Sequence, residues 1–362
     1  MKKLAAAISI ALSSACAIAH GQALDLQSGY SQQPLFTLDY NTAGGFDLDS
    51  SGDIFFMGAS AEAQAGYEQD QVDEATASSG YNDISVNTQL PEIGYGNFVT
   101  INNGAIYSSL YIDQNDGDIY SSSVSGTTAN PNFVGNIPSN YDLEFSGTTP
   151  YVSADVTGTD NEVFTLNPGT GATKPVLDTG GDFSGPIAFT ASGGLIYGGA
   201  GPVFVTNSNG QMIDEGGIPD IYIFSAAATT SGSTLKLSDA EMVIDNSGNG
   251  SIVMGPDNEL FQAFDPHIGT GSITEYDLTT GSSTLIATLP ANTDQYDFNG
   301  IRYFDGSLIA GVADYDDGVT DFIQINTIPE PRAAPLCVAG LLLAAFLRRR
   351  FSTRSTTRRT NS

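Results

Sequence analysis

The chain has 362 residues, 40% of them hydrophobic, and its 41 acidic residues outnumber its 12 basic ones, which gives a net charge of −29. Nine of the basic residues lie before position 4 or after position 331, so the body from 23 to 331 has three basic residues against all 41 acidic ones, a net charge of −38. A surface this acidic repels phosphate backbones, which excludes nucleic acid as a partner, and we expect screening cations to stabilise it.

Residues 1–22 are a predicted signal peptide. Lys2 and Lys3 precede an apolar run over 4–12, and mostly small residues follow over 13–19. A charged start, an apolar stretch and small residues at the cleavage site are the three parts of a secretory signal. The sequence therefore predicts export, with signal peptidase as a processing partner.

The two cysteines of the chain bear on lipidation and on disulfides. Cys16 follows small residues, but a lipobox has a large aliphatic residue three positions before the cysteine, and here that position is Ser13. We therefore favour cleavage without lipidation. Cys337 lies in the apolar tail, so the mature body has no cysteine and no disulfide framework, although export would permit one.

Residues 23–327 are predicted to form one all-β domain. Short runs rich in Val, Ile, Thr, Tyr and Phe recur between clusters of Gly, Asn, Asp and Ser, and no segment has a convincing helical period. A glycine turn followed by an apolar strand repeats along the body. The turns lie at Gly52, Gly104, Gly147, Gly194, Gly250 and Gly306.

The spacing of these turns predicts the architecture. Intervals of 43 to 56 residues are close to the ~40 to 50 residues of a four-stranded propeller blade. The pattern resembles a degenerate six-bladed β-propeller, and the alternative is a β-sandwich array or a solenoid. We expect the strand at 35–38 to pair with the last blade and close the ring. Because the chain has no tryptophan, Phe and Tyr should fill the space between blades.

Acidic turns are the candidate metal sites. Asp47, Asp49, Ser51 and Asp53 place oxygen ligands at alternate positions before a bend, like the first half of a calcium loop, but the twelfth position is Gly58 instead of a carboxylate. Calcium is therefore the one cofactor suggested, and the alternative is an ordinary solvated turn. Two further acidic turns contain Asp113, Asn115, Asp116 and Asp118, and Asp314, Asp316 and Asp317.

Residue counts exclude several enzyme classes. The body has at most two histidines, His20 and His267, and no cysteine, so a His-rich zinc site and a cysteine nucleophile are absent. No Gly-x-Ser-x-Gly motif supplies a serine nucleophile. A sialidase-like propeller needs several arginines, and the body has Arg302 alone. A glycosidase that uses two carboxylates stays open, because acidic residues abound. We predict a protein that is not an enzyme.

The tail over 328–362 has three parts. A Pro-Glu-Pro motif is followed by an apolar segment over 333–347 and a basic tail over 348–362. The motif is Pro329, Glu330 and Pro331, and the basic stop is Arg348, Arg349 and Arg350. This order resembles the PEP-CTERM sorting signal of bacterial surface proteins.

The resemblance implies a destination. In the PEP-CTERM family the tail holds the exported chain in the inner membrane until an exosortase-type enzyme cuts near the motif and transfers the body to the surface. The apolar segment has 15 residues, fewer than the ~20 of a typical spanning helix, although arginines can shorten the span by snorkelling. A plain tail anchor that is never cut is the alternative.

These observations predict an exported surface or extracellular-matrix protein with a structural or adhesive role. The predicted location in an extracellular matrix follows from the family resemblance, since PEP-CTERM proteins tend to occur in bacteria that make exopolysaccharide. Predicted partners are the sorting enzyme, the membrane through the tail, and extracellular polysaccharide. The alternatives are a propeller that binds a glycan through Tyr and Phe in its central face, and the carboxylate glycosidase.

Overall fold

The computed structural model describes residues 24–328, with gaps at 43, 65–67, 114–115, 155, 157–160, 181–184, 200–203, 207–211, 215–219, 246–249, 265–270 and 291–295. The predicted signal peptide, the sorting motif, the apolar segment and the basic stop lie outside these residues, as do both histidines. The described chain is all-β, as predicted. Its helices are the short pieces α1 (Ala61–Gln64), α2 (Ala226–Thr229) and the 3₁₀ turns η1 (Ala77–Ser79) and η2 (Leu237–Asp239).

The first half of the chain forms three consecutive antiparallel ladders. The first contains β3 (Phe46–Leu48), β4 (Ile54–Gly58), β5 (Gln69–Ala75) and the first part of β6 (Ile84–Asn102). The second contains the rest of β6, β7 (Ala105–Asp113), β8 (Asp116–Ser123) and β9 (Asn132–Asn136). The third contains β10 (Asn140–Ser146), β11 (Thr149–Ala154), β12 (Asn161–Leu166), β13 (Thr173–Asp178) and, parallel to β13, β19 (Leu235–Lys236).

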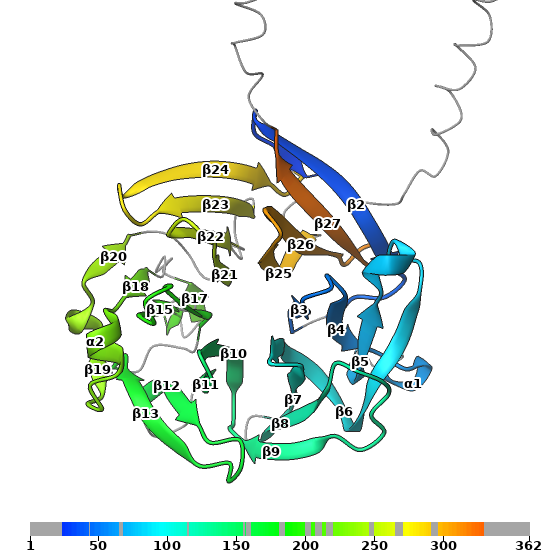
Figure 1. Ribbon diagram of the computed structural model, residues 1–362, viewed down its shortest axis with the longest axis horizontal. Helices are drawn as coiled ribbons and strands as arrows, with labels where there is room; N and C mark the ends of the chain where they lie inside the picture. Colours follow the sequence, from blue (N-terminus) through cyan, green and yellow to red (C-terminus); the bar gives the residue numbers. More distant parts are fainter. Residues whose placement is uncertain are drawn as a thin grey trace, which may run out of the picture.

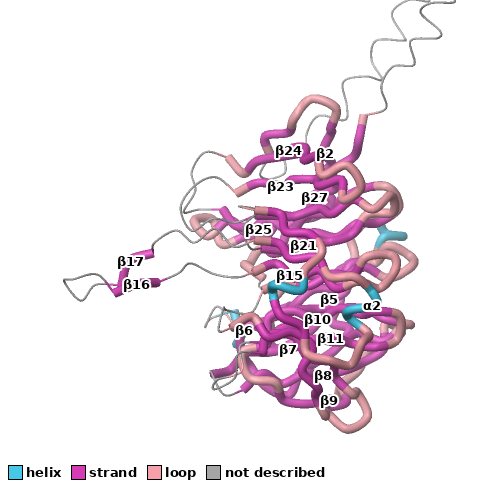
Figure 2. Tube along the Cα trace, turned by 90° about the vertical axis from the view of Figure 1, so that its left-hand side faces the viewer, coloured by secondary structure: helices cyan, strands magenta, loops and turns pink. Residues whose placement is uncertain are grey.

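The second half continues the pattern. One sheet contains β14 (Ile187–Phe189), β15 (Leu195–Gly198), β18 (Ile221–Ile223) and β20 (Met242–Ile244). The next contains β21 (Gly250–Met254), β22 (Glu259–Phe264), β23 (Ser272–Asp277), β24 (Ser282–Thr288) and β1 (Asp25–Leu26). The last contains β25 (Tyr296–Phe304), β26 (Ser307–Asp314), β27 (Val319–Thr327) and β2 (Tyr30–Leu38). A hairpin of β16 (Phe204–Thr206) and β17 (Met212–Asp214) stands away from these sheets (Figure 2).

The sheets form a propeller-like ring around a central axis (Figure 1). The first strand of each ladder faces the axis, and the inner strands contact one another in the cyclic order β3, β6, β10, β14, β21, β25 and back to β3. Strand β6 serves two ladders, because its first part lies at the outside of one and its last part at the inside of the next. A ring of this kind is neither a sandwich, in which two sheets pack face to face, nor a solenoid.

Strand β2 closes the ring, as the sequence predicted. It pairs with β27, with Phe36 opposite Phe322 and Leu38 opposite Thr320. The first and last parts of the body are thereby joined in one sheet (Figure 1). Pairing the two ends of the chain in this way protects the edge strands that an open ring would expose.

The predicted glycine turns are mostly confirmed. Gly52, Gly104, Gly147 and Gly306 have φ values between 65° and 84°, in the left-handed region that favours glycine. At the fourth turn Gly193, with a φ of 88°, takes the place predicted for Gly194.

At Gly250 the predicted strand is present, but the glycine has another role than in the hairpin turns. This residue begins the inner strand β21, and the left-handed residue of the following turn is Asn258, with a φ of 64°. A Cβ atom on Gly250 would collide with the carbonyl oxygen of Ala263, so glycine is required there by the close approach of two strands. Asparagine can take the turn position because it tolerates left-handed geometry better than most residues.

Aromatic pairs connect neighbouring sheets, as expected for a chain without tryptophan. The ring centroids are 5.1 Å apart for Tyr107 and Phe145, 4.7 Å for Tyr151 and Phe189, and 5.6 Å for Phe261 and Tyr303. In each pair the two residues belong to consecutive sheets. At the closing sheet Phe322 lies 4.5 Å from Phe36, 5.1 Å from Phe46 and 5.4 Å from Phe56.

Substitution of Phe322 by alanine should lower the free energy of unfolding by about 3–5 kcal/mol, the usual cost of removing a buried phenylalanine. Phe322 is completely buried and packs against rings from β2, β3 and β4, so its loss weakens the closing sheet and its neighbour. Urea unfolding measures the effect. Phe133→Ala is the matched control, because 58% of Phe133 is exposed; equal losses in the two variants would contradict the prediction.

Candidate functional site: a pocket on the axis of the ring

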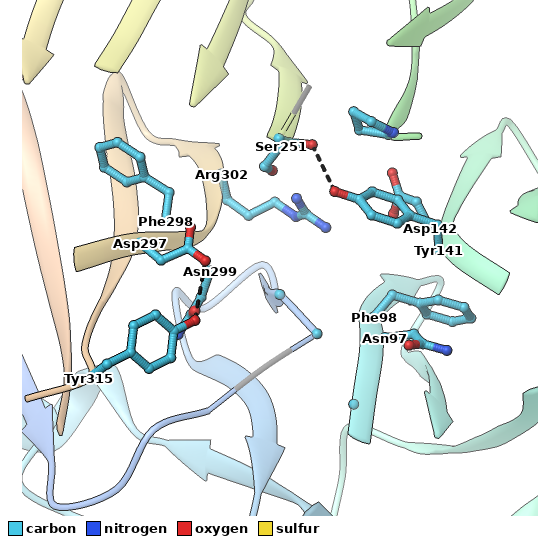
Figure 3. Close-up of a pocket in the computed structure, with 15 residues that line it drawn as sticks. Asn97, Phe98, Tyr141, Asp142, Ser251, Asp297, Phe298, Asn299, Arg302 and Tyr315 are labelled. Atoms are coloured by element: carbon cyan, nitrogen blue, oxygen red, sulfur yellow. Dashed lines mark hydrogen bonds between the residues drawn. The ribbon is translucent and has the colours of Figure 1, made fainter. Parts of the chain in front are cut away.

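A pocket of about 410 Å³ lies where the inner strands begin. Its walls come from residues at or just before the starts of β3, β10, β14, β21 and β25, from the middle of β6, and from the turn between β26 and β27. We call it the axial pocket (Figure 3). Its volume falls within the ~300–1,000 Å³ of small-molecule sites, and residues within or just before every inner strand line it.

Two tyrosines with exposed rings lie at the axial pocket. Tyr141 is 39% exposed and Tyr315 is 54% exposed. The Tyr141 hydroxyl donates to the Gly250 carbonyl at 3.4 Å, and the Tyr315 hydroxyl donates to Oδ2 of Asp297 at 3.2 Å. Figure 3 shows the two rings on opposite sides of the pocket. Their hydroxyls are therefore held while part of each ring stays accessible.

Amide side chains add hydrogen-bonding groups to the pocket wall. Nδ2 of Asn97 donates to Oδ1 of Asn140 at 2.9 Å. Nδ2 of Asn299 is buried and has no hydrogen-bond partner among the described residues. A buried donor without a partner costs free energy.

Arg302 extends from β25 into a group of carboxylates beside the pocket. Its Nε atom lies 3.4 Å from Oδ1 of Asp47, and one terminal nitrogen lies 3.5 Å from Oε1 of Glu144. The other terminal nitrogen donates to the Ile301 carbonyl at 3.0 Å. The guanidinium side chain is 11% exposed. Asp142 lines the pocket nearby and interacts electrostatically with the same arginine.

Burial dominates the ionisation of this group. It raises the pKa of Asp47 and Asp142, although the positive charge of Arg302 acts in the opposite direction. It also raises the pKa of Glu144 to about 8, again against the effect of Arg302 and with the help of the neighbouring negative charges. One cation therefore serves three desolvated acidic side chains, and burial favours the protonated form of each.

Four side chains near the axis connect neighbouring inner strands by hydrogen bonds to the backbone. Two are carboxylates: Oδ2 of Asp47 accepts the N–H of Ile101 at 2.6 Å, and Oδ2 of Asp142 accepts the N–H of Ile187 at 2.9 Å. Two are hydroxyls: Thr100 donates to the Leu143 carbonyl at 2.6 Å, and Oγ of Ser251 accepts the N–H of Ile301 at 3.2 Å. Together with the pair between Arg302 and Asp47, they join successive sheets around the axis. These bonds fix the geometry of the pocket wall.

The four residues of the predicted calcium loop have different partners. Asp47 faces Arg302, as described above, and Oδ1 of Asp49 accepts the backbone N–H groups of Ser51 and Asp53. Oδ1 of Asp53 accepts the N–H of Ala77. Over the described ranges, no cluster of three or more His, Cys, Asp or Glu has the arrangement of a metal site. Calcium binding at this turn stays a prediction.

The other acidic turns have local hydrogen bonds. Oδ1 of Asp314 accepts the N–H groups of Asp316 and Asp317, which is ordinary turn chemistry. Asp116 and Asp118 both accept from Nδ2 of Asn136 on the neighbouring strand. Asn115 lies outside the described residues, and so does the side chain of Asp113.

Within the described part of the chain, no helix is both long and apolar enough to cross a membrane.

Sequence reasoning missed most of the axial pocket. It used the lone Arg302 to exclude a sialidase-like site, and it singled out Asp47 for calcium, yet the structure brings these two residues together. One signal was available: Arg302 is the only arginine between positions 23 and 331. A lone arginine in so acidic a chain is a candidate for a buried ion pair. Nothing in the sequence marked Tyr141, Asp142 or Tyr315.

The comparisons with known proteins identify the fold. No protein-family model matches the sequence, and no curated protein matches it. A carbohydrate-active enzyme of family AA12 from Trichoderma reesei is similar in structure, with a TM-score of 0.55 and 13% identity over 85% of this chain and 98% of that one. A candidate oxidoreductase (glucose dehydrogenase) of Thermus thermophilus has a TM-score of 0.56 and 12% identity over 82% of this chain and 100% of that one. At such low identity the likeness concerns the fold alone, and this chain is an all-β protein with a propeller-like ring of sheets.

Proposed function

We propose that this chain is an exported, surface-sorted adhesive protein with a six-bladed propeller, and that its axial pocket binds a saccharide without cleaving it. The observation that carries the proposal is the pair of exposed tyrosine rings, Tyr141 and Tyr315, at a pocket lined by amides, a hydroxyl and carboxylates. Saccharides present hydroxyl groups that both donate and accept, and apolar faces that pack on aromatic rings. The pocket offers partners for both.

The cyclic order of the inner strands among the described residues supports the count of six blades, with β6 shared between two of them. The two similar structures are a carbohydrate-active enzyme and a candidate glucose dehydrogenase by name, but their low identity leaves the proposal resting on the pocket itself.

Saccharide binding should depend on the two tyrosines. We expect Tyr141→Ala and Tyr315→Ala each to weaken binding to a purified polysaccharide or oligosaccharide about tenfold or more, because aromatic stacking contributes roughly 1–2 kcal/mol. Isothermal titration calorimetry over a panel of oligosaccharides measures the affinities. Phe133→Ala removes an exposed ring from the outer strand β9 and should leave them unchanged.

Two outcomes would count against this function. If no saccharide binds the wild type, or if the Phe133 variant loses as much affinity as the tyrosine variants, the axial pocket is not the binding site. Reducing-sugar release from the same panel tests the glycosidase alternative. Release that disappears on a single Asp or Glu substitution would make the protein an enzyme.

The sorting part of the proposal rests on the tail, whose pattern of motif, apolar segment and arginines resembles PEP-CTERM signals. Deleting 329–362 and following a tagged body by cell fractionation tests it. A shortened, surface-associated body from the intact chain, and a simply secreted body from the deletion, would support sorting. An intact chain that stays uncut in the membrane would show a plain anchor.

A further inference from the structure

The axial pocket is short of positive charge. Asp142 and Asp297 both line it, and among the described residues no lysine or arginine nitrogen lies within 4.0 Å of either carboxylate. Arg302 also lines it, but its ion pairs within 4.0 Å are with Asp47 and Glu144, and it acts on Asp142 from a greater distance. Asp142 thus has only a share of one cation, and Asp297 has none within ion-pair distance among the described residues, in a body whose net charge is −38 from three basic and 41 acidic residues.

Neutral donors hold both carboxylates in place. Oδ2 of Asp142 accepts the backbone N–H of Ile187 at 2.9 Å, and Oδ2 of Asp297 accepts the hydroxyl of Tyr315 at 3.2 Å. Hydrogen bonds of this kind orient a carboxylate but do not cancel its charge. The two side chains are therefore preorganised as acceptors, and an incoming cation need not order them.

The exposed tyrosines also favour a positively charged ligand. The face of an aromatic ring attracts a cation within about 6 Å of its centre. Tyr315 donates its hydroxyl to Asp297, and the consecutive residues Tyr141 and Asp142 both line the pocket. A pocket that combines aromatic rings with carboxylates is a suitable environment for an ammonium group.

We infer that the saccharide bound in the axial pocket carries a protonated primary amine, as an amino sugar without an N-acetyl group does, and that Asp142 and Asp297 are its charge partners. The inference rests on the proposed function, whose ligand class it narrows. The same charges disfavour uronic acids and phosphorylated sugars, because those ligands would bring like charge to an uncompensated negative pocket.

A lysine side chain has the same ammonium chemistry, so the ligand scaffold has to be tested separately. The amides of Asn97 and Asn299 and the hydroxyl of Ser251 line the pocket and favour a sugar, whose many hydroxyl groups both donate and accept hydrogen bonds, whereas the stem of a lysine does neither. An amino-sugar oligomer should therefore bind more tightly than a lysine peptide of equal charge.

Calorimetry with four probes tests the inference: a glucosamine oligomer, the N-acetylated oligomer of the same length, a glucuronate oligomer and trilysine. We expect the glucosamine oligomer to bind at least tenfold more tightly than the N-acetylated one, a difference of about 1.4 kcal/mol. Trilysine should bind at least tenfold more weakly than the glucosamine oligomer, and glucuronate should not bind.

Asp142→Asn and Asp297→Asn supply the matched variants, because the amide oxygen keeps the acceptor for Ile187 N or for Tyr315 while the charge is removed. Each should weaken binding of the glucosamine oligomer about tenfold and leave the N-acetylated oligomer within twofold. Asp257→Asn, an exposed carboxylate in the turn between β21 and β22, is the control for net charge and should change neither affinity.

The outcomes distinguish a failure of this inference from a failure of the proposed function on which it rests. Equal affinity for the amine and N-acetylated oligomers, or equal effects of the Asp142 and Asp257 variants, overturns the inference and leaves a saccharide site. Tightest binding of trilysine overturns it in favour of a peptide ligand. Absence of binding to every saccharide overturns the proposed function as well.

Discussion

Substitution of Arg302 by methionine should lower the free energy of unfolding by about 3–5 kcal/mol at pH 7.5, the range found when one partner of a buried ion pair is removed. Methionine retains much of the length of the side chain but leaves Asp47, Asp142 and Glu144 without the cation that they share. Because these carboxylates can then take up protons, the variant should recover part of its stability at pH 5. Urea unfolding at the two pH values measures both effects.

Lys236→Met is the matched control, because it removes a cation from the same acidic body. The Lys236 side chain is 69% exposed and its ammonium lies 3.7 Å from Asp178, so its loss should cost no more than about 1 kcal/mol. Arg302→Lys should lie between the two, since an ammonium cannot bridge Asp47 and Glu144 as the planar guanidinium does. Equal stability of the Arg302→Met and Lys236→Met proteins would show that the carboxylate group does not depend on its arginine.

The protein should lose stability as the pH rises from 6 to 9, contrary to a chain whose carboxylates are all stabilised as anions. The pKa of Glu144 is about 8 in the folded protein, above the ordinary value of 4.5. A raised folded pKa means that the stabilising contribution is complete below pH 4.5 and is lost as the pH passes through 8, because the folded state then has to ionise a buried acid. Between pH 6 and pH 9 this linkage gives at most about 2.7 kcal/mol, and the 27% exposure of the Glu144 side chain moderates the penalty, so we expect a decrease of about 1–2 kcal/mol.

Glu144→Gln should flatten this profile, because glutamine stays neutral over the whole range. Thermal unfolding at pH 6, 7.5 and 9 measures the difference, and Glu92→Gln, an exposed position, should keep the wild-type slope. The raised pKa of Asp47 and Asp142 acts in the same direction, so a residual slope in the Glu144 variant is expected. A wild-type protein that is more stable at pH 9 than at pH 6 would contradict the assignment.

The axial pocket and the carboxylate group around Arg302 share one structural basis. Side chains of one inner strand bond to the next, as Asp142 does to the N–H of Ile187 and Ser251 does to the N–H of Ile301. The residues that hold the ring together at its axis therefore also form the pocket wall. Mutations at Asp142 should be judged by both stability and binding, which is why the asparagine variant that keeps the acceptor is preferred there.

Local sequence rules predicted the strands and most of their turns. Runs of β-branched and aromatic residues predicted an all-β body and the strand at 35–38, which lies in β2, since those preferences act over a few residues. Left-handed glycines marked the turns at Gly52 and Gly306 for the same reason. Gly250 also precedes a strand, but there the close approach of a neighbouring strand requires glycine, which no local rule predicts.

The sequence by itself determined that the body is an acidic all-β repeat, that strand 35–38 could close it, and that both ends of the chain have the pattern of export and sorting segments. Only the tertiary structure decided which polar residues meet at the axis. Asp47 bonds to Ile101, 54 positions away, and pairs with Arg302 near the other end of the body. Such contacts depend on how many strands lie between the partners and on the curvature of the ring, and no local pattern encodes either.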